Sequence, residues 1–401
     1  DTVLHTLVPI DVYNNGDRRN YIDAWGDSLQ SFCLQFGMYA NGIEKNKSIV
    51  YCMENSTQKF FVIGSDNDTC YITLSTKELE YNMKPHATID IFSKSNDTLT
   101  ISVFAKNTNV HMWQEYFDES WEPSYGNFLG NDSWATEGDD NYTIGEMGCT
   151  KSAITVGASV SGVFSKDLEN NFYSNYENHG MIATYSSKGP TIDKRMKPEI
   201  TAPGGILFCA SNSYDTMLDP FLVSQYISPK NGRVYSYEAT EGTSFASPMV
   251  AGIIALMLQI NPNLEPEQIK TIIQKTAIKD GFTTLTPDPT KWGSGKINAS
   301  AAIKETIRLA GTINIPKNEK AINVYQNPIQ RNLTLGYESL ESGYFFVEVS
   351  NSQGKVIQIK IWQLSQGTNQ LNMTLLECED DLYSICIIGK GGEIVKKVLI
   401  N

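Results

Sequence analysis

One serine in the chain has a sequence context suited to nucleophilic chemistry. Ser244 lies in the run Gly242-Thr243-Ser244-Phe245-Ala246-Ser247-Pro248, directly before an apolar stretch from Met249 to Leu258. The glycine predicts a turn and the apolar stretch predicts a helix, so Ser244 is expected at a helix N-terminus. The unpaired N–H groups and the partial positive charge at that end can stabilise a developing oxyanion. For an isolated Gly-Thr-Ser, a helix N-cap is the alternative interpretation.

A serine hydroxyl becomes a good nucleophile only when a neighbouring base takes its proton and a third group orients that base. The chain has four histidines, namely His5, His86, His111 and His179. The first three lie in a region with β-strand patterns, and His179 lies in a polar loop. None of them is expected to act as the base, so the sequence offers a nucleophile without its proton acceptor.

The run around Ser244 resembles the nucleophile segment of the subtilases, the subtilisin-like serine peptidases. Further segments resemble that family in the same chain order: Ser-Ala-Ile-Thr-Val-Gly-Ala at 152–158, Tyr-Ser-Ser-Lys-Gly-Pro at 185–190, Lys-Pro-Glu-Ile-Thr-Ala-Pro-Gly-Gly at 197–205 and Trp-Gly-Ser-Gly-Lys-Ile-Asn-Ala at 292–299. The resemblance covers about residues 140–305. It implies an α/β domain and peptide-bond hydrolysis through an acyl-enzyme on Ser244. The backbone N–H of Ser244 would donate to the oxyanion, with Thr243 in a supporting role.

The resemblance also implies residues that this sequence lacks. In subtilases an aspartate in Asp-[Ser/Thr]-Gly, a histidine in His-Gly-Thr and an oxyanion asparagine precede the serine. None of these motifs occurs in the chain. We therefore expect them upstream of Asp1, in a missing N-terminal part of the same peptidase, and we expect the chain alone to be inactive.

Two hypotheses about function follow. In the first, the chain is the C-terminal part of a secreted bacterial serine endopeptidase, as the intact Gly-Thr-Ser segment favours. In the second, it is a degenerate subtilase that acts as a non-catalytic binding or scaffold protein through a β-sandwich. Trp25, Trp113 and Trp121 could then stack on sugars, although we expect core tryptophans at these positions.

A candidate substrate-binding segment precedes the strand expected at residues 153–158. In the family this segment forms a wall of the pocket for the residue before the scissile bond. Ile144, Gly145 and Glu146 occupy it here. Gly145 would leave room for a substrate side chain, and Glu146 could favour a basic one.

The strand and helix patterns divide the chain into three parts. Residues 1–125 show short alternating strands and predict an all-β sandwich, similar to the jelly-roll insertion of some bacterial subtilases. Residues 126–310 alternate strands and helices and predict the C-terminal part of an α/β subtilisin-like domain with an incomplete parallel sheet. Residues 321–401 predict a small β-sandwich. This last part resembles the C-terminal sorting domain of the bacterial type IX secretion route, and a generic immunoglobulin-like appendage is the alternative.

Composition limits the partners and the cofactors. A net charge of −13 over 401 residues argues against nucleic-acid binding, and the apolar run at Met249–Leu258 is too short to cross a bilayer. Protein or peptide substrates are the expected partners, and a secreted or cell-surface location is expected. No cofactor is certain; calcium is a candidate because subtilases often carry it, although no Asp-x-Asp-x-Asp-Gly loop occurs. The seven cysteines form no C-x-x-C pair, and buried free thiols are favoured over disulfides.

Overall fold

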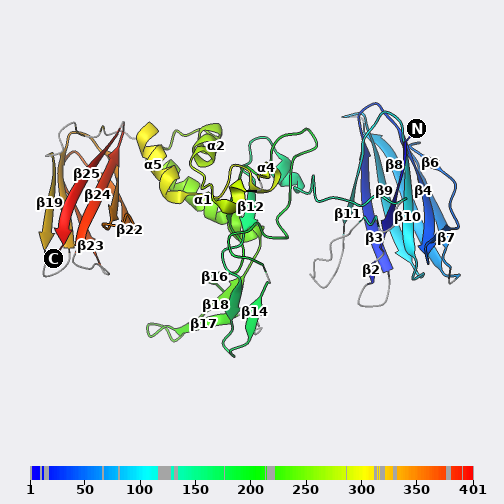
Figure 1. Cartoon of the computed structure of the whole chain (residues 1–401), viewed down its shortest axis with the longest axis horizontal. Coiled ribbons are helices and arrows are strands. Elements are labelled where there is room, and N and C mark those ends of the chain that lie inside the picture. The colour runs from blue at the N-terminus through cyan, green and yellow to red at the C-terminus, as the bar shows by residue number, and fades with distance from the viewer. Residues whose placement is uncertain are drawn as a thin grey trace. The chain divides into compact units, whose positions relative to one another are not determined.

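A computed structural model describes most of the chain as two compact units, Asp1–Asp139 and Asp140–Asn401. The described residues are 2–9, 11–12, 18–65, 67–79, 82–115, 128–130, 134–175, 177–212, 214, 222–285, 287–310, 314, 316, 321–327, 332–375, 381–390 and 392–400. Strands account for 47% and helices for 15% of the described residues, so the described part is mostly β and its α/β architecture is confined to part of the second unit. Figure 1 shows the elements of each unit in turn.

The first unit consists of two antiparallel sheets around one apolar core. One sheet has the strand order β1-β10-β4-β5 with β6 on β4, and the other has the order β11-β3-β9-β8-β7 with β2 on β3. The strands are β1 (Thr2–Val8), β2 (Asp11–Val12), β3 (Arg18–Gly26), β4 (Phe32–Ala40), β5 (Ile43–Lys45), β6 (Tyr51–Cys52), β7 (Thr57–Ile63), β8 (Thr69–Leu79), β9 (Lys84–Ser93), β10 (Thr98–Ala105) and β11 (Val110–Glu115). Both sheets contribute to the core, for example Phe36 from β4 and Ile89 from β9.

This unit extends beyond residue 125, where the sequence suggested a boundary. Leu129 and Leu7 exchange backbone hydrogen bonds of 2.8 and 3.1 Å, and the N–H of Thr136 donates to the carbonyl of His5 at 2.6 Å. The chain therefore returns to β1 after β11. Residues near 125 themselves lie outside the described part.

The cysteines of the first unit differ from the expectation of free thiols. Cys33 on β4 and Cys52 on β6 are directly opposed and form a disulfide, which closes a loop with a sequence separation of 19. Cys70 remains a buried free thiol, and burial raises its pKa to about 11. The expectation is wrong for the pair because two neighbouring strands place the two Cβ atoms side by side.

The second unit begins with an α/β layer. Strand β12 (Val156–Ser159) pairs in parallel with β15 (Ile200–Pro203), and Lys296 adds a parallel bridge at Thr201. The helices are η1 (Glu146–Cys149), a 3₁₀ turn, and α1 (Thr243–Ile260), α2 (Pro266–Lys275), α3 (Gly281–Thr284), α4 (Pro289–Trp292) and α5 (Ala299–Ala310). Ala158 and Ile200 from the strands share one buried cluster with Val250 of α1, Ile273 of α2 and Ile307 of α5. The parallel pair is thus covered by helices, as in an α/β layer.

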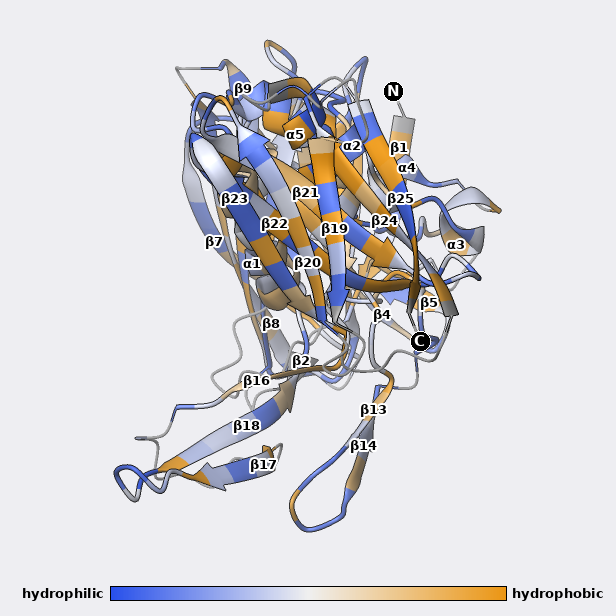
Figure 2. Ribbon diagram, turned by 90° about the vertical axis from the view of Figure 1, so that its left-hand side faces the viewer, coloured by the Kyte–Doolittle hydropathy of each residue, from blue (hydrophilic) through white to orange (hydrophobic). Residues whose placement is uncertain are grey.

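Two β-ribbons project from this layer in both views (Figures 1 and 2). The hairpin consists of β13 (Phe164–Lys166) and β14 (Phe172–Ser174). The other ribbon is an antiparallel sheet of β16 (Leu207–Ala210), β18 (Val234–Thr240) and β17 (Leu222–Ile227), with β18 in the centre. We call this sheet the arm.

The C-terminal part of the second unit is a sandwich of two antiparallel sheets. Their orders are β19-β20-β23 and β22-β21-β24-β25. The strands are β19 (Ile322–Asn327), β20 (Asn332–Ser339), β21 (Gly343–Ser350), β22 (Val356–Leu364), β23 (Gly367–Thr374), β24 (Asp381–Gly389) and β25 (Gly392–Ile400). Phe346 and Ile388 of the second sheet join the cluster that contains Ile307, and Lys304 of α5 forms an ion pair with Glu348.

Candidate active site

Ser244 lies where the parallel strands end. Helix α1 starts at Thr243, so Ser244 is the second helical residue, and its side chain is exposed. The preceding Gly242 donates its N–H to the carbonyl of Gly204 at 2.8 Å, and Gly204 directly follows β15. Open α/β sheets carry their sites at the carboxyl ends of the strands, and Ser244 occupies that edge.

Two glycines are required by the geometry of this turn. Gly242 has φ 137°, a conformation that residues with a Cβ adopt only under strain. A Cβ at Gly204 would come within 2.7 Å of the Ala158 Cβ and 3.0 Å of the Gly242 carbonyl oxygen. The close approach of the two segments fixes the point from which α1 starts.

Tyr185 stabilises the same contact and was not recognised from the sequence. Its hydroxyl donates to the carbonyl of Gly204 and accepts the N–H of Gly242 at 3.2 Å. Burial, together with the nearby charge of Glu241, raises the pKa of this phenol well above its usual range. Tyr185 therefore stays protonated and keeps its donor role. The only indication of this residue in the sequence was its place at the start of the Tyr-Ser-Ser-Lys-Gly-Pro segment, which resembles the family.

The N-terminus of α1 offers a donor for an oxyanion. The N–H of Phe245 is taken by the carbonyl of Gly242 at 3.1 Å. Among the described residues, no acceptor takes the N–H of Ser244, which lies in the first turn where helical partners are absent. This N–H and the hydroxyl of Ser244 come from one residue, which is the arrangement expected of a serine peptidase nucleophile. Thr243 opens the helix, and no contact in the described part assigns it a chemical role.

The histidines have other partners. His5 Nδ1 is 2.8 Å from the hydroxyl of Ser102, and His86 Nε2 lies within hydrogen-bond distance of a carboxylate oxygen of Asp23. His111 stacks on Trp113. His179 is exposed and precedes Gly180, whose backbone faces Phe282 and Lys296. Within the described residues, no histidine contacts Ser244.

Helix α1 presents a long uncovered face beside Ser244. Its buried residues are Ala246, Val250, Met257 and Ile260, whereas Ser247, Pro248, Met249, Ala251, Gly252, Ala255, Leu256 and Gln259 are exposed. Helix α1 has 18 residues and is, by length and composition alone, long and apolar enough to cross a membrane. In the structure, 28% of these residues are buried. Such length and composition are weak evidence for a membrane span, because the core helix of a folded domain can meet the same criteria. One side of α1 packs on β12 and β15, as the helix of a folded domain does.

The segment expected to bind substrate lies at η1. Ile144 is half-buried, Gly145 precedes the 3₁₀ turn and Glu146 opens it. A Cβ at Gly145 would meet no atom within 4 Å, so this position borders open space. No contact between this segment and Ser244 occurs in the described part of the chain.

Trp25 and Trp113 are half-buried and lie outside the core, contrary to the expectation of core tryptophans; Trp121 is outside the described residues. In the pairing of β3 with β11, Trp25 lies directly opposite His111, and Trp113 lies directly opposite Asp23. The ring of Trp25 stacks on His86 at 4.0 Å, and its Nε1 donates to Asp23 at 2.6 Å. These side chains share the outer face of their sheet because they alternate with buried residues along β3.

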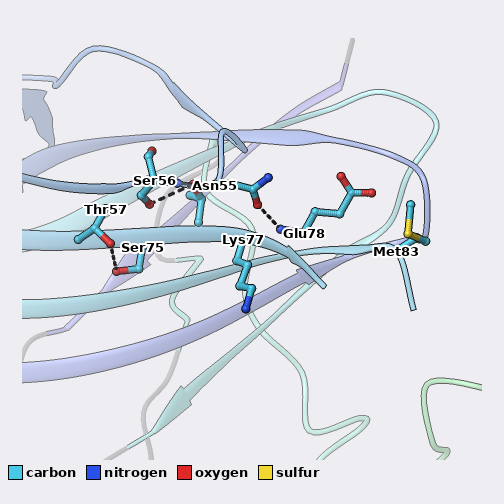
Figure 3. Close-up of a pocket in the computed structure, with 8 residues that line it drawn as sticks. Asn55, Ser56, Thr57, Ser75, Lys77, Glu78 and Met83 are labelled. Atoms are coloured by element: carbon cyan, nitrogen blue, oxygen red, sulfur yellow. Dashed lines mark hydrogen bonds between the residues drawn. The ribbon is translucent and has the colours of Figure 1, made fainter. Parts of the chain in front are cut away.

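A polar depression of about 560 Å³ lies along β7 and β8 (Figure 3). Several of its polar groups bond one another: Asn55 accepts the N–H of Glu78 at 2.7 Å, and the hydroxyls of Thr57 and Ser75 are 3.0 Å apart. Its lining contains neither His nor Cys. Among the described residues, no group of three or more His, Cys, Asp or Glu side chains is placed to hold a metal ion.

Comparison with known proteins shows the family of the chain. The subtilase family matches residues 11–304, and the chain belongs to this family. The chain is similar to serine protease AprX of Bacillus subtilis, with 34% identity over 41% of the chain and 33% of the relative. It is also similar to the minor extracellular protease Vpr of B. subtilis, with 29% identity over 54% of the chain and 26% of the relative. Subtilisin-like protease SBT4.3 of Arabidopsis thaliana is 31% identical over 30% of the chain and 16% of the relative. The chain thus spans a third or less of the length of these relatives.

Proposed function

We propose that the chain is the C-terminal part of a secreted subtilisin-like serine endopeptidase. Ser244 attacks the scissile carbonyl and forms the acyl-enzyme, and its backbone N–H holds the oxyanion. The aspartate, the histidine and the second oxyanion donor come from a segment upstream of Asp1. The observation that carries the proposal is the exposed serine at the N-terminus of α1, held by the Gly204–Gly242 contact.

The uncovered face of α1 supports a missing partner segment. Leu256 and Met249 of α1 are 43% and 39% exposed, although the opposite side of this helix packs on a folded layer. Apolar faces of this length are normally covered in soluble domains. The upstream segment, bearing the catalytic histidine, would cover this face and would bring its base to the hydroxyl of Ser244.

Secretion is supported by chemistry and by the relatives. The Cys33–Cys52 disulfide suits an oxidising compartment outside the cytosol. One relative is named as an extracellular protease. We further propose that residues 321–401 act as a sorting domain, that residues 1–125 are a jelly-roll insertion, and that the location is bacterial, secreted or at the cell surface.

For specificity, we propose that Ile144, Gly145 and Glu146 border the pocket for the substrate residue before the scissile bond. The exposed carboxylate of Glu146 would favour a basic side chain there. The exchange Glu146→Gln should then reduce the preference for arginine over leucine at that substrate position.

One observation keeps the binding-protein alternative in view. The half-buried Trp25 and Trp113 lie on the outer face of a sheet, where aromatic rings can contact a ligand. This hypothesis needs no catalytic partner segment, and Ser244 would then have no chemical task.

Complementation separates the two hypotheses. The chain is expressed with and without its upstream coding sequence and treated with a fluorophosphonate probe. We expect no labelling of the chain alone and stoichiometric labelling of Ser244 in the complemented protein, with peptide hydrolysis; Ser244→Ala should abolish both. A matched control is Ser247→Ala, one turn further along the exposed face of α1, which should leave both intact. A complemented protein that is folded and monodisperse but unlabelled would reject the peptidase proposal.

A further inference from the structure

The arm has an aromatic face. In the antiparallel register Tyr226 is directly opposite Tyr235, and Phe208 is directly opposite Ala239. Because side chains alternate along a strand, Tyr235, Tyr237 and Ala239 of β18 point to the same side. Phe208, Tyr226, Tyr235 and Tyr237 therefore share one face, which we call the aromatic face.

These four rings are open to solvent. Their exposed fractions are 65% for Phe208, 55% for Tyr226, 37% for Tyr235 and 44% for Tyr237. The other face of the arm carries no aromatic ring among its paired residues: Glu238 accepts from Ser211 at 3.2 Å, Gln225 donates to Ser236 at 3.3 Å, and Ile227 lies opposite Val234. A contiguous patch of exposed aromatic side chains marks a binding site more often than single scattered aromatic residues do.

The arm is continuous with the nucleophile segment. Strand β18 ends at Thr240, only four residues before Ser244. The hairpin is joined to the same region: Tyr173 donates to Glu241 at 3.1 Å, and the N–H of Leu168 donates to the carbonyl of Leu222 at 2.9 Å. Phe164 and Phe172 add two exposed rings on the hairpin. Exposed aromatic residues thus occur close to the turn that holds Ser244 and on both ribbons, and Figure 2 shows these two ribbons projecting from the domain.

We propose that the aromatic face is a binding site for the extended polypeptide substrate, remote from the scissile bond. A strand rises about 3.3 Å per residue, so the seven residues of β18 span about 20 Å. An extended substrate attacked at Ser244 would need several residues beyond the scissile bond to reach the rings. The preferred substrate is then a long, unfolded chain with apolar and aromatic side chains, rather than a short peptide.

The chemistry of the face identifies this occupant. Its four side chains carry no formal charge, and Arg233 at the end of the arm is stacked on Tyr214 at 3.4 Å. Tyrosine and phenylalanine rings bind apolar side chains while the tyrosine hydroxyls still bond to peptide groups. The choice of a polypeptide over other apolar partners rests on the proposed peptidase function and on the continuity with Ser244.

Binding can be measured on the chain as it is, without catalysis. The probe is fluorescein-labelled casein, an unfolded protein, and the signal is fluorescence anisotropy. The test variant is Tyr226→Ser with Tyr235→Ser. The matched control is Ile227→Ser with Val234→Ser, the next cross-strand pair, whose side chains lie on the other face and are 66% and 39% exposed. We expect the test variant to bind casein about tenfold more weakly and the control to stay within about twofold.

Equal affinity of the test variant and the unchanged chain would overturn the proposal, and so would an equal loss in the control. If the test variant fails to fold, Phe208→Ser on β16 takes its place, with an expected loss of about threefold. Light scattering is run in parallel. A dimer that the test variant dissociates, with casein binding unchanged, would assign the face to a second copy of the chain and would also overturn the proposal.

Hydrolysis by the complemented peptidase distinguishes failure of this proposal from failure of the proposed function. We expect the test variant to lower kcat/KM for casein and to leave kcat/KM for a chromogenic tetrapeptide unchanged. Hydrolysis of both substrates with no effect of the variant would reject the aromatic face alone. If the complemented protein hydrolyses neither, the peptidase function fails, and the anisotropy result still decides whether the face binds polypeptide.

Discussion

The N–H of Gly242 donates to the carbonyl of Gly204 at 2.8 Å, and this bond joins the end of β15 to the start of α1. The segments around Gly204 and Gly242, nearly forty positions apart in the sequence, thereby determine the position of Ser244. Tyr185 bonds to both glycines, so the turn is held from a third segment as well. The position of Ser244 is set before any catalytic partner is present.

The first prediction concerns Gly242. With φ 137°, the Gly242→Ala variant must strain or move the turn, at a cost of about 1–3 kcal/mol. We expect fluorophosphonate labelling of Ser244 in the complemented peptidase to fall about 100-fold, because small displacements of a nucleophile have large kinetic effects. The control is Gly281→Ala at the start of α3, where an added Cβ would come no closer than 3.8 Å to another heavy atom. Unchanged labelling in Gly242→Ala would show that the turn does not position the serine.

The second prediction concerns the uncovered face of α1. Without a partner segment the chain should self-associate, because apolar surface of this kind promotes association. The Leu256→Glu variant places a charge on that face and should shift the chain toward monomer in light scattering. The control is Leu309→Glu on α5. This leucine is also exposed but lies on another helix, so the variant should have no effect. A chain that is already monomeric and melts cooperatively would contradict both this prediction and the missing partner segment.

The third prediction concerns the disulfide of the first unit. A bridge with a sequence separation of 19 should stabilise the fold by about 3 kcal/mol through the entropy of the unfolded chain. The Cys33→Ala and Cys52→Ala double variant should therefore unfold at lower denaturant concentration. Adding a reductant to the unchanged chain should reproduce the shift, and the double variant should not respond to it. Cys70→Ala is a poor control because that thiol is buried, so Cys149→Ala in the second unit serves instead.

The fourth prediction concerns pH. Burial raises the pKa of Asp23, but hydrogen bonds from His86 and Trp25 outweigh it, and the pKa lies below its ordinary value of 3.8. A carboxyl with a lowered pKa in the folded state stabilises that state above the unfolded pKa and loses this contribution as the pH falls through the folded pKa. Asp23→Asn should therefore destabilise the first unit at pH 7 by about 1–2 kcal/mol, the value of charge-assisted hydrogen bonds. The difference from the unchanged chain should shrink below pH 4, and a difference independent of pH would contradict the assignment.

Local patterns predicted many elements because their causes are local. The alternation of polar and apolar residues at Thr98–Ala105 is typical of a half-exposed strand and coincides with β10. Pro266, whose fixed φ suits a first helical position, is the first residue of α2. Thr100 and Ser102 of β10 are nevertheless buried. They lie in the centre of the sheet and bond to Glu44 and His5, and such partners from distant strands cannot be read from a local pattern.

The candidate site was predictable only in part for the same reason. The Gly-Thr-Ser segment predicted the turn at Gly242 and the start of α1, since both are determined within a few residues, and the role of Ser244 as nucleophile stays a proposal. The hydroxyl of Tyr185 and the close approach of Gly204 to Ala158 depend on tertiary contacts. The Cys33–Cys52 pairing likewise depends on which strands become neighbours, and spacing alone does not reveal this.

The contact between α5 and the C-terminal sandwich has a consequence for any shortened form of the chain. Phe346 and Ile388 are buried against the same cluster as Ile307, and Glu348 neutralises Lys304. A polypeptide ending at residue 310 would expose this patch and leave an unbalanced charge beside it. Residues 321–401 are therefore no independent appendage: a protease that removes them would also alter the solubility of the domain that remains, unless another surface replaces them.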